Sequence, residues 1–287
     1  IPYYVFNFKA DFKEKVIDPF IDSYRCGMTP NPCIECNRHL KFTQLHQKAR
    51  ELQCDVVVTG HYARITKDEQ GYHLLKGKDA AKDQSYVLYS LTQEQLAHTC
   101  FPLGEYTKDE IRRMAEEQGF FNAGKKDSQD ICFIPDGDYR RFIEETTGQK
   151  STPGNFVDQE GNVLGIHKGY YCYTIGQRRG LGISAPQSLY VVEIRPEKNE
   201  VVLGSNEDLF HSHLTADHFN WIEQVGPDEI IKARIRYHQT EKEATVRVLE
   251  DNRVEVDFLE PQRAITKGQA VVLYRGDAVA GGGRIIG

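Results

Sequence analysis

DVVVTGHYAR (residues 55–64) contains the short stretch that decides the fold class. Its apolar run, Val56 to Val58, is β-branched and does not alternate with polar residues, which is typical of a strand buried on both faces in a parallel sheet. Loops at the carboxyl ends of parallel strands build ligand sites, so Gly60 and His61 are placed to contact a nucleotide or RNA. On local grounds alone, a hydrogen-bonded surface histidine explains His61 equally well.

Helix and strand signals alternate through the rest of the first half. A capping box, Thr107 with Glu110, begins one helix, and Gly148 ends another. The apolar run 131–134 predicts a second short buried strand. Helical spacing or capping predicts helices over 11–25 (interrupted by Pro19), 37–52, 107–119 and 138–147.

After residues 151–154 the helical spacing fades, and glycines and turn residues multiply. Alternating segments that flank turn residues predict three hairpins: 189–194 with 200–203, 244–249 with 254–259, and 269–274 with 278–286. Short regular strands of this kind favour a small sandwich or barrel. We therefore predict an α/β domain over residues 1–145, a small Gly-rich central domain over 146–210, and an all-β domain over 211–287.

Composition narrows the function classes. The chain has 287 residues, of which 39% are hydrophobic, so a packed core is expected. The sequence contains no run of 18 apolar residues, so no membrane span is predicted. Its seven scattered cysteines predict a reducing, cytoplasmic compartment. The net charge of −6 excludes a general attraction for nucleic acid, so such a partner needs local basic patches.

TPNPCIECNRHLKF (residues 29–42) holds Cys33 and Cys36 between a Pro-Asn-Pro turn and a predicted helix. A lone pair at this spacing suits a zinc ion, an iron–sulfur cluster, a dithiol couple, or two buried small side chains. No second CxxC supplies the remaining ligands of zinc, so zinc is less favoured. We expect Cys36 at the helix N-terminus, where the helix dipole, Arg38 and Lys41 would lower its pKa.

Three further stretches carry weaker signals. YTIGQRRGLG (173–182) places two arginines among glycines near tyrosines, which indicates either an RNA-contacting surface or a Gly-rich turn with a solvated basic tip. Strand alternation would put Arg234, Arg236 and His238 on one face and Tyr237 on the other. By its local signal, the polar cluster 82–85 is a plausible helix cap, and Cys132 is a core cysteine.

Taken together, these motifs resemble one family, the tRNA-specific 2-thiouridylases. The resemblance spans the chain, and its motifs are long and in the family's order: TPNPCIECNRHLKF, VTGHYAR, KDQSYVLY, FPLG, KKDSQDICFI, GIHKG, YTIGQRRGLG and the closing GGG. It implies a catalytic domain resembling the adenine-nucleotide α-hydrolases, with a Rossmann-type parallel sheet, then a small central domain and a C-terminal antiparallel β-barrel.

The resemblance also implies a reaction, the ATP-dependent transfer of sulfur to C2 of the wobble uridine of tRNA. ATP, with Mg²⁺, would adenylate the uridine oxygen. Cys132 would carry a persulfide, and Cys36 would be the resolving nucleophile that leaves a disulfide. Gly60 would approach ATP. By position, the tRNA contacts would be Asn31, Pro32, Cys33, His61, Lys82, Asp83, Gln84, Arg236, Tyr237 and Gln269.

Two departures from the family pattern bear on this reaction. The Ser-Gly-Gly-x-Asp-Ser phosphate loop is absent, so we expect the chain to begin after that segment and, by itself, to bind ATP poorly and be inactive. Cys33 stands where many members have Asp. Cys33 could replace this Asp only as a thiol, or it could join Cys36 and Cys132 as a third ligand of an iron–sulfur cluster.

The expected partners are tRNA and a sulfur donor, either a cysteine desulfurase or a sulfur relay protein. No association with a membrane is expected. A non-catalytic tRNA-binding module is the other alternative.

Overall fold

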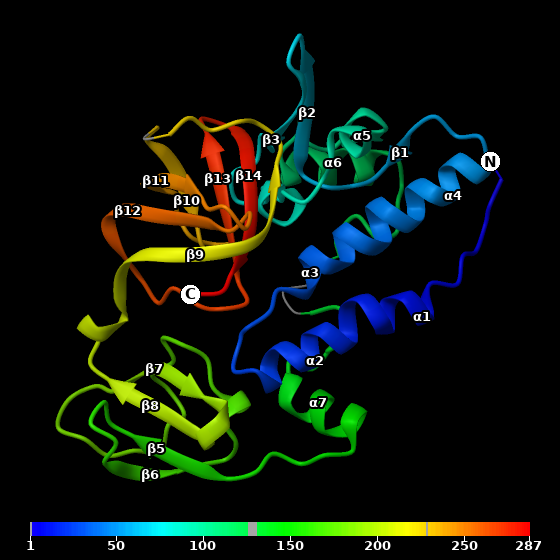
Figure 1. The fold of residues 1–287 in the computed structure, drawn as a ribbon. Coiled ribbons are helices and arrows are strands. Elements are labelled where there is room, and N and C mark those ends of the chain that lie inside the picture. Colours follow the sequence, from blue (N-terminus) through cyan, green and yellow to red (C-terminus); the bar gives the residue numbers. More distant parts are fainter. Residues whose placement is uncertain (1, 126–130, 228) are drawn as a thin grey trace.

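The computed structural model describes residues 2–125, 131–227 and 229–287. Three parts follow one another along the chain: helices with a small parallel sheet, a four-stranded central sheet, and a C-terminal barrel (Figure 1). Two long helices of the first part lie side by side in Figure 1, and the central sheet lies below the barrel. Within the described ranges, no helix has the length and apolar character needed to span a membrane.

The first long helix comprises α1 (Lys9–Phe12), a π-helical segment (Lys13–Ile17) and α2 (Asp18–Arg25), as the spacing over 11–25 predicts. Pro19 does not interrupt it. This proline lies in the first turn of α2, where the preceding π-helical turns have shifted the hydrogen-bond ladder and no N–H is needed from it. The apolar face of the helix is buried at Val16, Phe20 and Tyr24.

The second long helix begins at Pro32, five residues before the predicted start. It comprises α3 (Pro32–Glu35), a π-helical segment (Cys36–Gln44) and α4 (Leu45–Glu51). Asn31 caps it, because its Oδ1 accepts the backbone N–H of Cys33 at 3.2 Å. Pro32 fits the first helical position, where an N–H has no partner within the helix.

The predicted parallel strand is present, but only one of its faces is covered in the described structure. β1 (Val57–Val58) pairs in parallel with β4 (Thr99–Cys100). Val57 is buried, whereas Val58 is 61% exposed. The expectation of burial on both faces is therefore wrong for this strand.

A hairpin without a clear sequence signal joins the first part to the barrel. β2 (Ala63–Asp68) and β3 (Gly71–Lys76) are antiparallel, and Leu75 of β3 pairs with Ala278 of β14 (Ala278–Ile285). One hydrophobic cluster spans both parts and includes Phe42 from the long helix and Val272 from the barrel. The first part and the barrel thus share a core.

Short capped helices complete the first part. α5 (Gln93–Ala97) and α6 (Lys108–Glu117) each begin with a capping box, the second formed by Thr107 and Glu110 as predicted. α7 (Tyr139–Thr147) is capped by Asp138 and ends at Gly148, which has a φ of 68°. Residues 131–134 form turns rather than the predicted strand, although Ile134 is buried.

The central sheet has the order β6-β5-β8-β7. The predicted hairpin of 189–194 with 200–203 is confirmed as its β7–β8 pair. A separate hydrophobic cluster, which includes Phe156 and Val201, fills this domain. The four strands are β5 (Gly154–Val157), β6 (Val163–His167), β7 (Tyr190–Arg195) and β8 (Glu200–Gly204).

The C-terminal strands close into an antiparallel barrel. Their order is β13-β10-β11-β12-β9-β14, and pairing of β13 with β14 completes the ring. The two hairpins predicted here are confirmed as β11–β12 and β13–β14. Besides β14, the strands are β9 (Phe210–Trp221), β10 (Ile231–Arg234), β11 (Lys242–Val248), β12 (Val254–Arg263) and β13 (Ala270–Arg275).

Gly104, the last residue of the FPLG motif, sits where the chain leaves no room for a side chain. Its carbonyl accepts the backbone N–H of Lys78 at 2.9 Å. A Cβ added at Gly104 would overlap the backbone carbonyl of Ala63, at the start of β2. Backbone cannot move aside as a flexible side chain can, so the hairpin and its loop depend on glycine here.

We predict that Gly104→Ala lowers the free energy of unfolding by about 1–3 kcal/mol, since the added methyl forces β2 away from the loop. Urea denaturation followed by circular dichroism would measure the loss. Gly124→Ala is the matched control, because a Cβ there has no heavy atom of the described residues within 4 Å and the φ is not positive. Equal stability of the two variants would contradict this prediction.

Candidate active site

The segment before the second long helix is fastened to the barrel. The backbone N–H of Thr29 donates to the Lys267 carbonyl at 2.8 Å, and Gln269 Nε2 donates to the Thr29 carbonyl at 2.8 Å. Between them, Gly268 has a φ of 89°, and a Cβ there would stand 3.0 Å from both Thr29 N and Thr29 O. This clamp, with the Asn31 cap, sets the position from which the helix begins.

Three thiols converge near the start of that helix. Solvent reaches Cys33 and Cys132, whereas Cys36 is half-buried, and none of the three is in a disulfide. The charge of Cys132 acts on both Cys33 and Cys36, which brings together residues almost one hundred positions apart. Cys132 lies in an exposed turn, so its expected placement on a buried strand is wrong.

The surroundings of Cys33 and Cys36 favour the protonated form of these two thiols. Desolvation by the surrounding protein raises the pKa of Cys36; the Lys41 ammonium opposes this and Cys132 adds to it. Desolvation also raises the pKa of Cys33, again with Cys132 adding and Lys41 opposing. The expected low pKa of Cys36 is therefore wrong for this state, because the helix begins at Pro32 and Cys36 is not at its N-terminus.

His61 is buried, with 6% of its surface exposed, rather than facing solvent. It packs against the rings of Phe42 and Phe101. Its Nδ1 is 2.8 Å from Thr59 Oγ1, and its Nε2 is 3.5 Å from Lys41 Nζ. Burial, and then Lys41, lowers the pKa of His61 to about 4.

His61 is therefore neutral at pH 7. A neutral ring can accept from the Lys41 ammonium at Nε2 while donating to Thr59 at Nδ1. In this position His61 orients Lys41, and it does not offer a surface to a large ligand.

Asp83 and Gln84 of the KDQ motif are bound to their own domain and to the barrel. Buried Asp83 accepts from the Gly77 and Ser85 amides, each at 3.1 Å, and its Oδ2 lies 3.5 Å from Arg234 Nη1. Gln84 Oε1 accepts the Tyr62 amide at 2.9 Å. These two side chains shape the loop on which half-buried Lys82 is presented.

Sequence patterns did not indicate how Asp83 is held in place. Arg234 also pairs with Glu241, which in turn lies 3.0 Å from Lys76 Nζ. Both cations stand over the ring of Tyr274, at 5.0 Å for Arg234 and 4.7 Å for Lys76. Asp83 and Arg234 are about 150 positions apart in the sequence, so no local sequence signal predicts that they pair.

Arg236 and Tyr237 lie in the turn after β10, which ends at Arg234, so the expected alternation along a strand is wrong. Arg236 Nη2 donates to the Ala264 carbonyl at 3.0 Å and to Thr266 Oγ1 at 2.9 Å. Burial raises the pKa of Tyr237, and Asp83 and Cys33 add to it. Tyr237 therefore lies close to the thiols.

Gly60, expected to approach ATP, is exposed at the end of β1. Among the described residues, a Cβ there would meet only the Leu103 side chain, at an ordinary contact distance of 3.5 Å, so there is room beside it. In the described part of the chain, no group of three His, Cys, Asp or Glu side chains is arranged to hold a metal ion. The three cysteines are near one another but are not preassembled as a ligand set.

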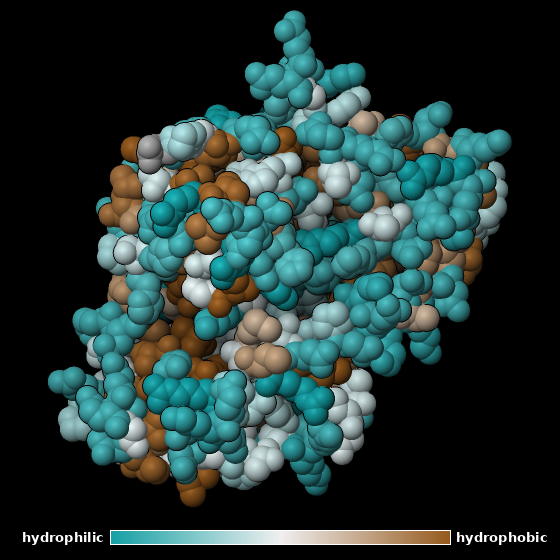
Figure 2. All heavy atoms as spheres, in the orientation of Figure 1, coloured by the Kyte–Doolittle hydropathy of each residue, from teal (hydrophilic) through white to brown (hydrophobic). Residues whose placement is uncertain are grey.

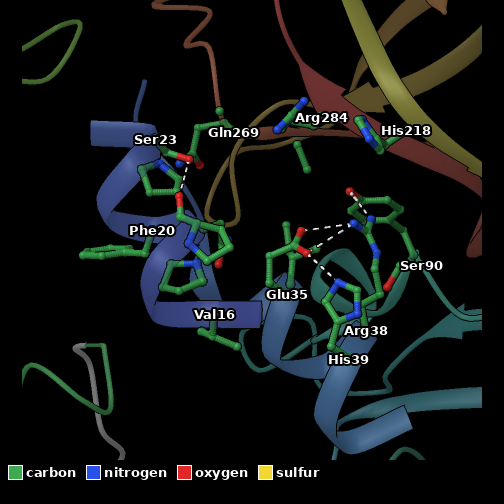
Figure 3. A pocket seen from close by; sticks show the side chains of 18 of the residues that line it. Val16, Phe20, Ser23, Glu35, Arg38, His39, Ser90, His218, Gln269 and Arg284 are labelled. Atoms are coloured by element: carbon green, nitrogen blue, oxygen red, sulfur yellow. Dashed lines mark hydrogen bonds and ion pairs between the residues drawn. The ribbon is translucent and has the colours of Figure 1, made fainter. Parts of the chain in front are cut away.

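A cleft of about 610 Å³ lies on the other face of the thiol-bearing helix (Figure 3). Glu35, Arg38 and His39 line this cleft, whereas Cys33 and Cys36 are not among its lining residues. Asn31, Pro32 and Gln269 border it as well. These three expected tRNA contacts therefore lie at the junction of the two faces.

The charges that line the cleft are paired with one another. On the helix wall, Glu35 lies 3.1 Å from Arg38 and 3.2 Å from His39 (Figure 3). On the barrel wall, Asp217 lies 2.7 Å from Arg284 and 3.1 Å from His218. Each arginine thus has a carboxylate, and the cleft holds little uncompensated charge.

Known families match all three parts of the chain. Residues 1–136 match the tRNA methyl transferase HUP domain, residues 140–205 the tRNA methyl transferase PRC-barrel domain, and residues 211–285 the aminomethyltransferase β-barrel domain. These matches confirm the predicted order of an α/β domain, a central domain and a C-terminal β-barrel.

Similar proteins match over almost the whole chain. The tRNA-specific 2-thiouridylase MnmA of Lachnoclostridium phytofermentans is 51% identical over 100% of this chain and 81% of its own length. The protein of the same name from Clostridium botulinum strain Eklund 17B is 51% identical over 99% and 80%, and that from Clostridioides difficile is 50% identical over 99% and 80%. The chain belongs to the tRNA-specific 2-thiouridylase family.

Proposed function

We propose that this chain transfers sulfur to C2 of the wobble uridine of tRNA. The observation that carries the proposal is the meeting of Cys33 and Cys36 with Cys132, a thiol from a distant segment that contributes to the raised pKa of both. Membership of the 2-thiouridylase family supports it. Two close thiols can carry a sulfur atom and then release it by exchange.

The first step activates the uridine. Its C2 oxygen attacks the α-phosphorus of ATP, pyrophosphate leaves, and C2 then bears an adenylate that can depart as AMP. Mg²⁺ would neutralise the phosphate charge. The open space beside exposed Gly60, at the carboxyl end of β1, supports a nucleotide there.

The second step moves the sulfur. The persulfide of Cys132 attacks C2 through its terminal sulfur, and AMP leaves, so tRNA is joined to Cys132 through a disulfide. The Cys36 thiolate then attacks Cys132 Sγ, and that S–S bond breaks with its electron pair on the sulfur bound to C2. The products are 2-thiouridine and a Cys36–Cys132 disulfide, which an external dithiol must reduce.

Solvent access to Cys132 supports loading by a sulfur donor protein, because a donor persulfide must reach this thiol directly. A cysteine desulfurase or a sulfur relay protein would serve. All seven cysteines are free, and a reducing cytoplasm fits this chemistry.

An iron–sulfur route through Cys33, Cys36 and Cys132 remains the second candidate, favoured by the coupling of all three thiols. They are not arranged as a ligand set, so we derive no step from a cluster. Iron analysis of anaerobically purified protein separates the routes: iron-free, fully active protein excludes the cluster. A tRNA-binding module without catalysis would bind tRNA and never convert ATP to AMP.

Cys132→Ala should lower 2-thiouridine formation by about 10²-fold or more, because the sulfur-carrying atom is gone. Retardation of thiolated tRNA on mercury-containing gels measures the product. Cys54→Ala is the control: it is also exposed, and its Sγ is 3.8 Å from the Leu52 carbonyl at the far end of the long helix. Normal product from Cys132→Ala would refute the proposed function.

Cys36→Ala should stop the reaction after sulfur has reached C2, since nothing then breaks the Cys132–tRNA disulfide. A denaturing gel without reductant should show tRNA joined to protein, and dithiothreitol should release 2-thiouridine. Cys33→Ala, three residues away, should not trap this adduct. An adduct from Cys33→Ala and none from Cys36→Ala would mean that Cys33 is the resolving thiol.

Lys41→Gln should raise the pKa of Cys36 further, because the ammonium that stabilises its thiolate is removed. At pH 7.5 alkylation of Cys36 by iodoacetamide should slow by roughly 2- to 5-fold, and the pH profile should shift upward. Mass spectrometry of the Cys36 peptide gives the rate. Lys48→Gln, whose ammonium pairs with Glu51 at 2.6 Å, is the control; identical profiles for both variants would disprove the role of Lys41.

A further inference from the structure

Sulfur transfer as proposed above ends with both of its thiols in one disulfide. Cys132 cannot accept another sulfur atom until its bond to Cys36 is broken, because a donor persulfide transfers sulfur only to a free thiol. The third thiol of the site, Cys33, takes no part in those steps. Cys132 and Cys36 both contribute to the raised pKa of Cys33, so Cys33 lies close to both.

Cys33 and Cys36 lie on one turn of one helix. α3 spans Pro32–Glu35, and Cys36 follows it with helical dihedral angles, φ −62° and ψ −44°. In an α-helix, residues three positions apart have Cα atoms about 5 Å apart and side chains on the same side. A disulfide needs a Cα separation of about 4.4–6.8 Å. The backbone of these two residues therefore suits a disulfide without rearrangement of the helix.

Exchange of one disulfide for the other changes which segments are tied together. Cys132 lies in a turn that packs on the first long helix, where the ring centre of Phe133 is 5.4 Å from that of Phe20. A Cys36–Cys132 bond fastens this turn to the second long helix, whereas a Cys33–Cys36 bond stays within one helical turn. Thiols held on one rigid element react without a diffusional encounter, so Cys33 has an advantage over a dilute external dithiol.

Formation of the Cys36–Cys132 disulfide makes Cys33 a better nucleophile. While all three are thiols, desolvation and then Cys132 and Cys36 raise the pKa of Cys33, and the Lys41 ammonium opposes them. Two sulfurs joined in a disulfide carry no charge, so two of the three causes that raise this pKa disappear. The pKa of Cys33 then falls, and more of this residue is thiolate. Cys33 is thereby activated at the stage that needs a nucleophile.

We propose that Cys33 breaks the Cys36–Cys132 disulfide and so returns Cys132 to the sulfur donor as a free thiol. The Cys33 thiolate, whose proton has gone to solvent, attacks Cys36 Sγ. The bond between Cys36 and Cys132 breaks, and its electron pair goes to Cys132 Sγ, which takes up a proton from water. One disulfide replaces another, so this step involves no net oxidation. The inference rests on the proposed function and adds a step to it.

The new disulfide stays within reach of an external dithiol, which then reduces it. Solvent reaches Cys33, whereas Cys36 is half-buried. The second long helix lies at the surface, and Figure 2 shows hydrophilic side chains over most of the face that carries α3 and α4. A protein dithiol can therefore attack Cys33 Sγ while the sulfur donor acts on Cys132, so the two partners use different sulfur atoms.

The first test maps the disulfides after a single turnover. The chain, reconstituted with whatever ATP-binding segment it needs and loaded with persulfide sulfur, is mixed with tRNA and ATP without reductant, quenched with acid and alkylated with iodoacetamide. Mass spectrometry should find Cys33 joined to Cys36 and an alkylated Cys132. In Cys33→Ser it should find Cys36 joined to Cys132. Wild-type protein in which Cys132 remains joined to Cys36, or becomes joined to Cys33, would overturn the inference.

The second test follows repeated turnovers with a thioredoxin-type protein dithiol as reductant. Cys33→Ser should form its first equivalent of 2-thiouridine at the wild-type rate and slow the later turnovers by about 10-fold, because Cys132 stays blocked. Excess dithiothreitol, a small molecule that reduces the Cys36–Cys132 bond directly, should restore the later turnovers. Cys100→Ser, exposed on β4, is the matched control and should leave both phases unchanged. Equal later rates for Cys33→Ser and wild type would contradict the inference.

The outcomes separate this inference from the proposed function. Reconstituted wild-type protein that forms no 2-thiouridine would refute both. A normal first turnover with the Cys36–Cys132 disulfide retained would refute the inference alone. If Cys33→Ser loses the first turnover, Cys33 acts in sulfur transfer itself, and loss of bound iron with it would identify Cys33 as a cluster ligand; either result overturns the inference. Circular dichroism of each variant confirms that it is folded.

Discussion

The clamp between Thr29 and the barrel is the contact on which the site depends. Two hydrogen bonds of 2.8 Å join Thr29 to Lys267 and Gln269, residues about 240 positions later. One bond joins two backbone groups and the other is donated by the Gln269 side chain, and together they hold both the N–H and the carbonyl of Thr29, three residues before the helix begins at Pro32. The helix carries two of the thiols. Their position in the first domain therefore depends on the C-terminal barrel.

Desolvation favours the protonated form of the two thiols on the helix, Cys33 and Cys36. Desolvation raises the pKa of Cys33 and of Cys36, and the Lys41 ammonium only partly offsets it. Bound RNA would bring phosphate charge close to these thiols and would raise their pKa again.

Sequence patterns predicted the elements whose signals are local. The capping box of Thr107 and Glu110, the end of α7 at Gly148 and three hairpins of the second half depend on residues a few positions apart. The patterns failed where tertiary contacts decide. The β3–β14 pairing and the burial of His61 against Phe101 have no local signature. The pKa of Cys36 was misjudged because the helix begins at Pro32.

The resemblance to a family predicted the reactive thiols and the candidate tRNA contacts. The structure distinguishes these contacts by the hydrogen bonds that each side chain makes within the chain. Asp83 and Gln84 make hydrogen bonds within the chain, so their replacement would deform the loop before it removed any contact with RNA. Arg236 is different, because its buried Nε has no partner in the chain. A polar side chain that is fixed in the fold but lacks a hydrogen-bond partner is the stronger candidate for direct contact. A bound ligand would supply the hydrogen bond that the chain does not.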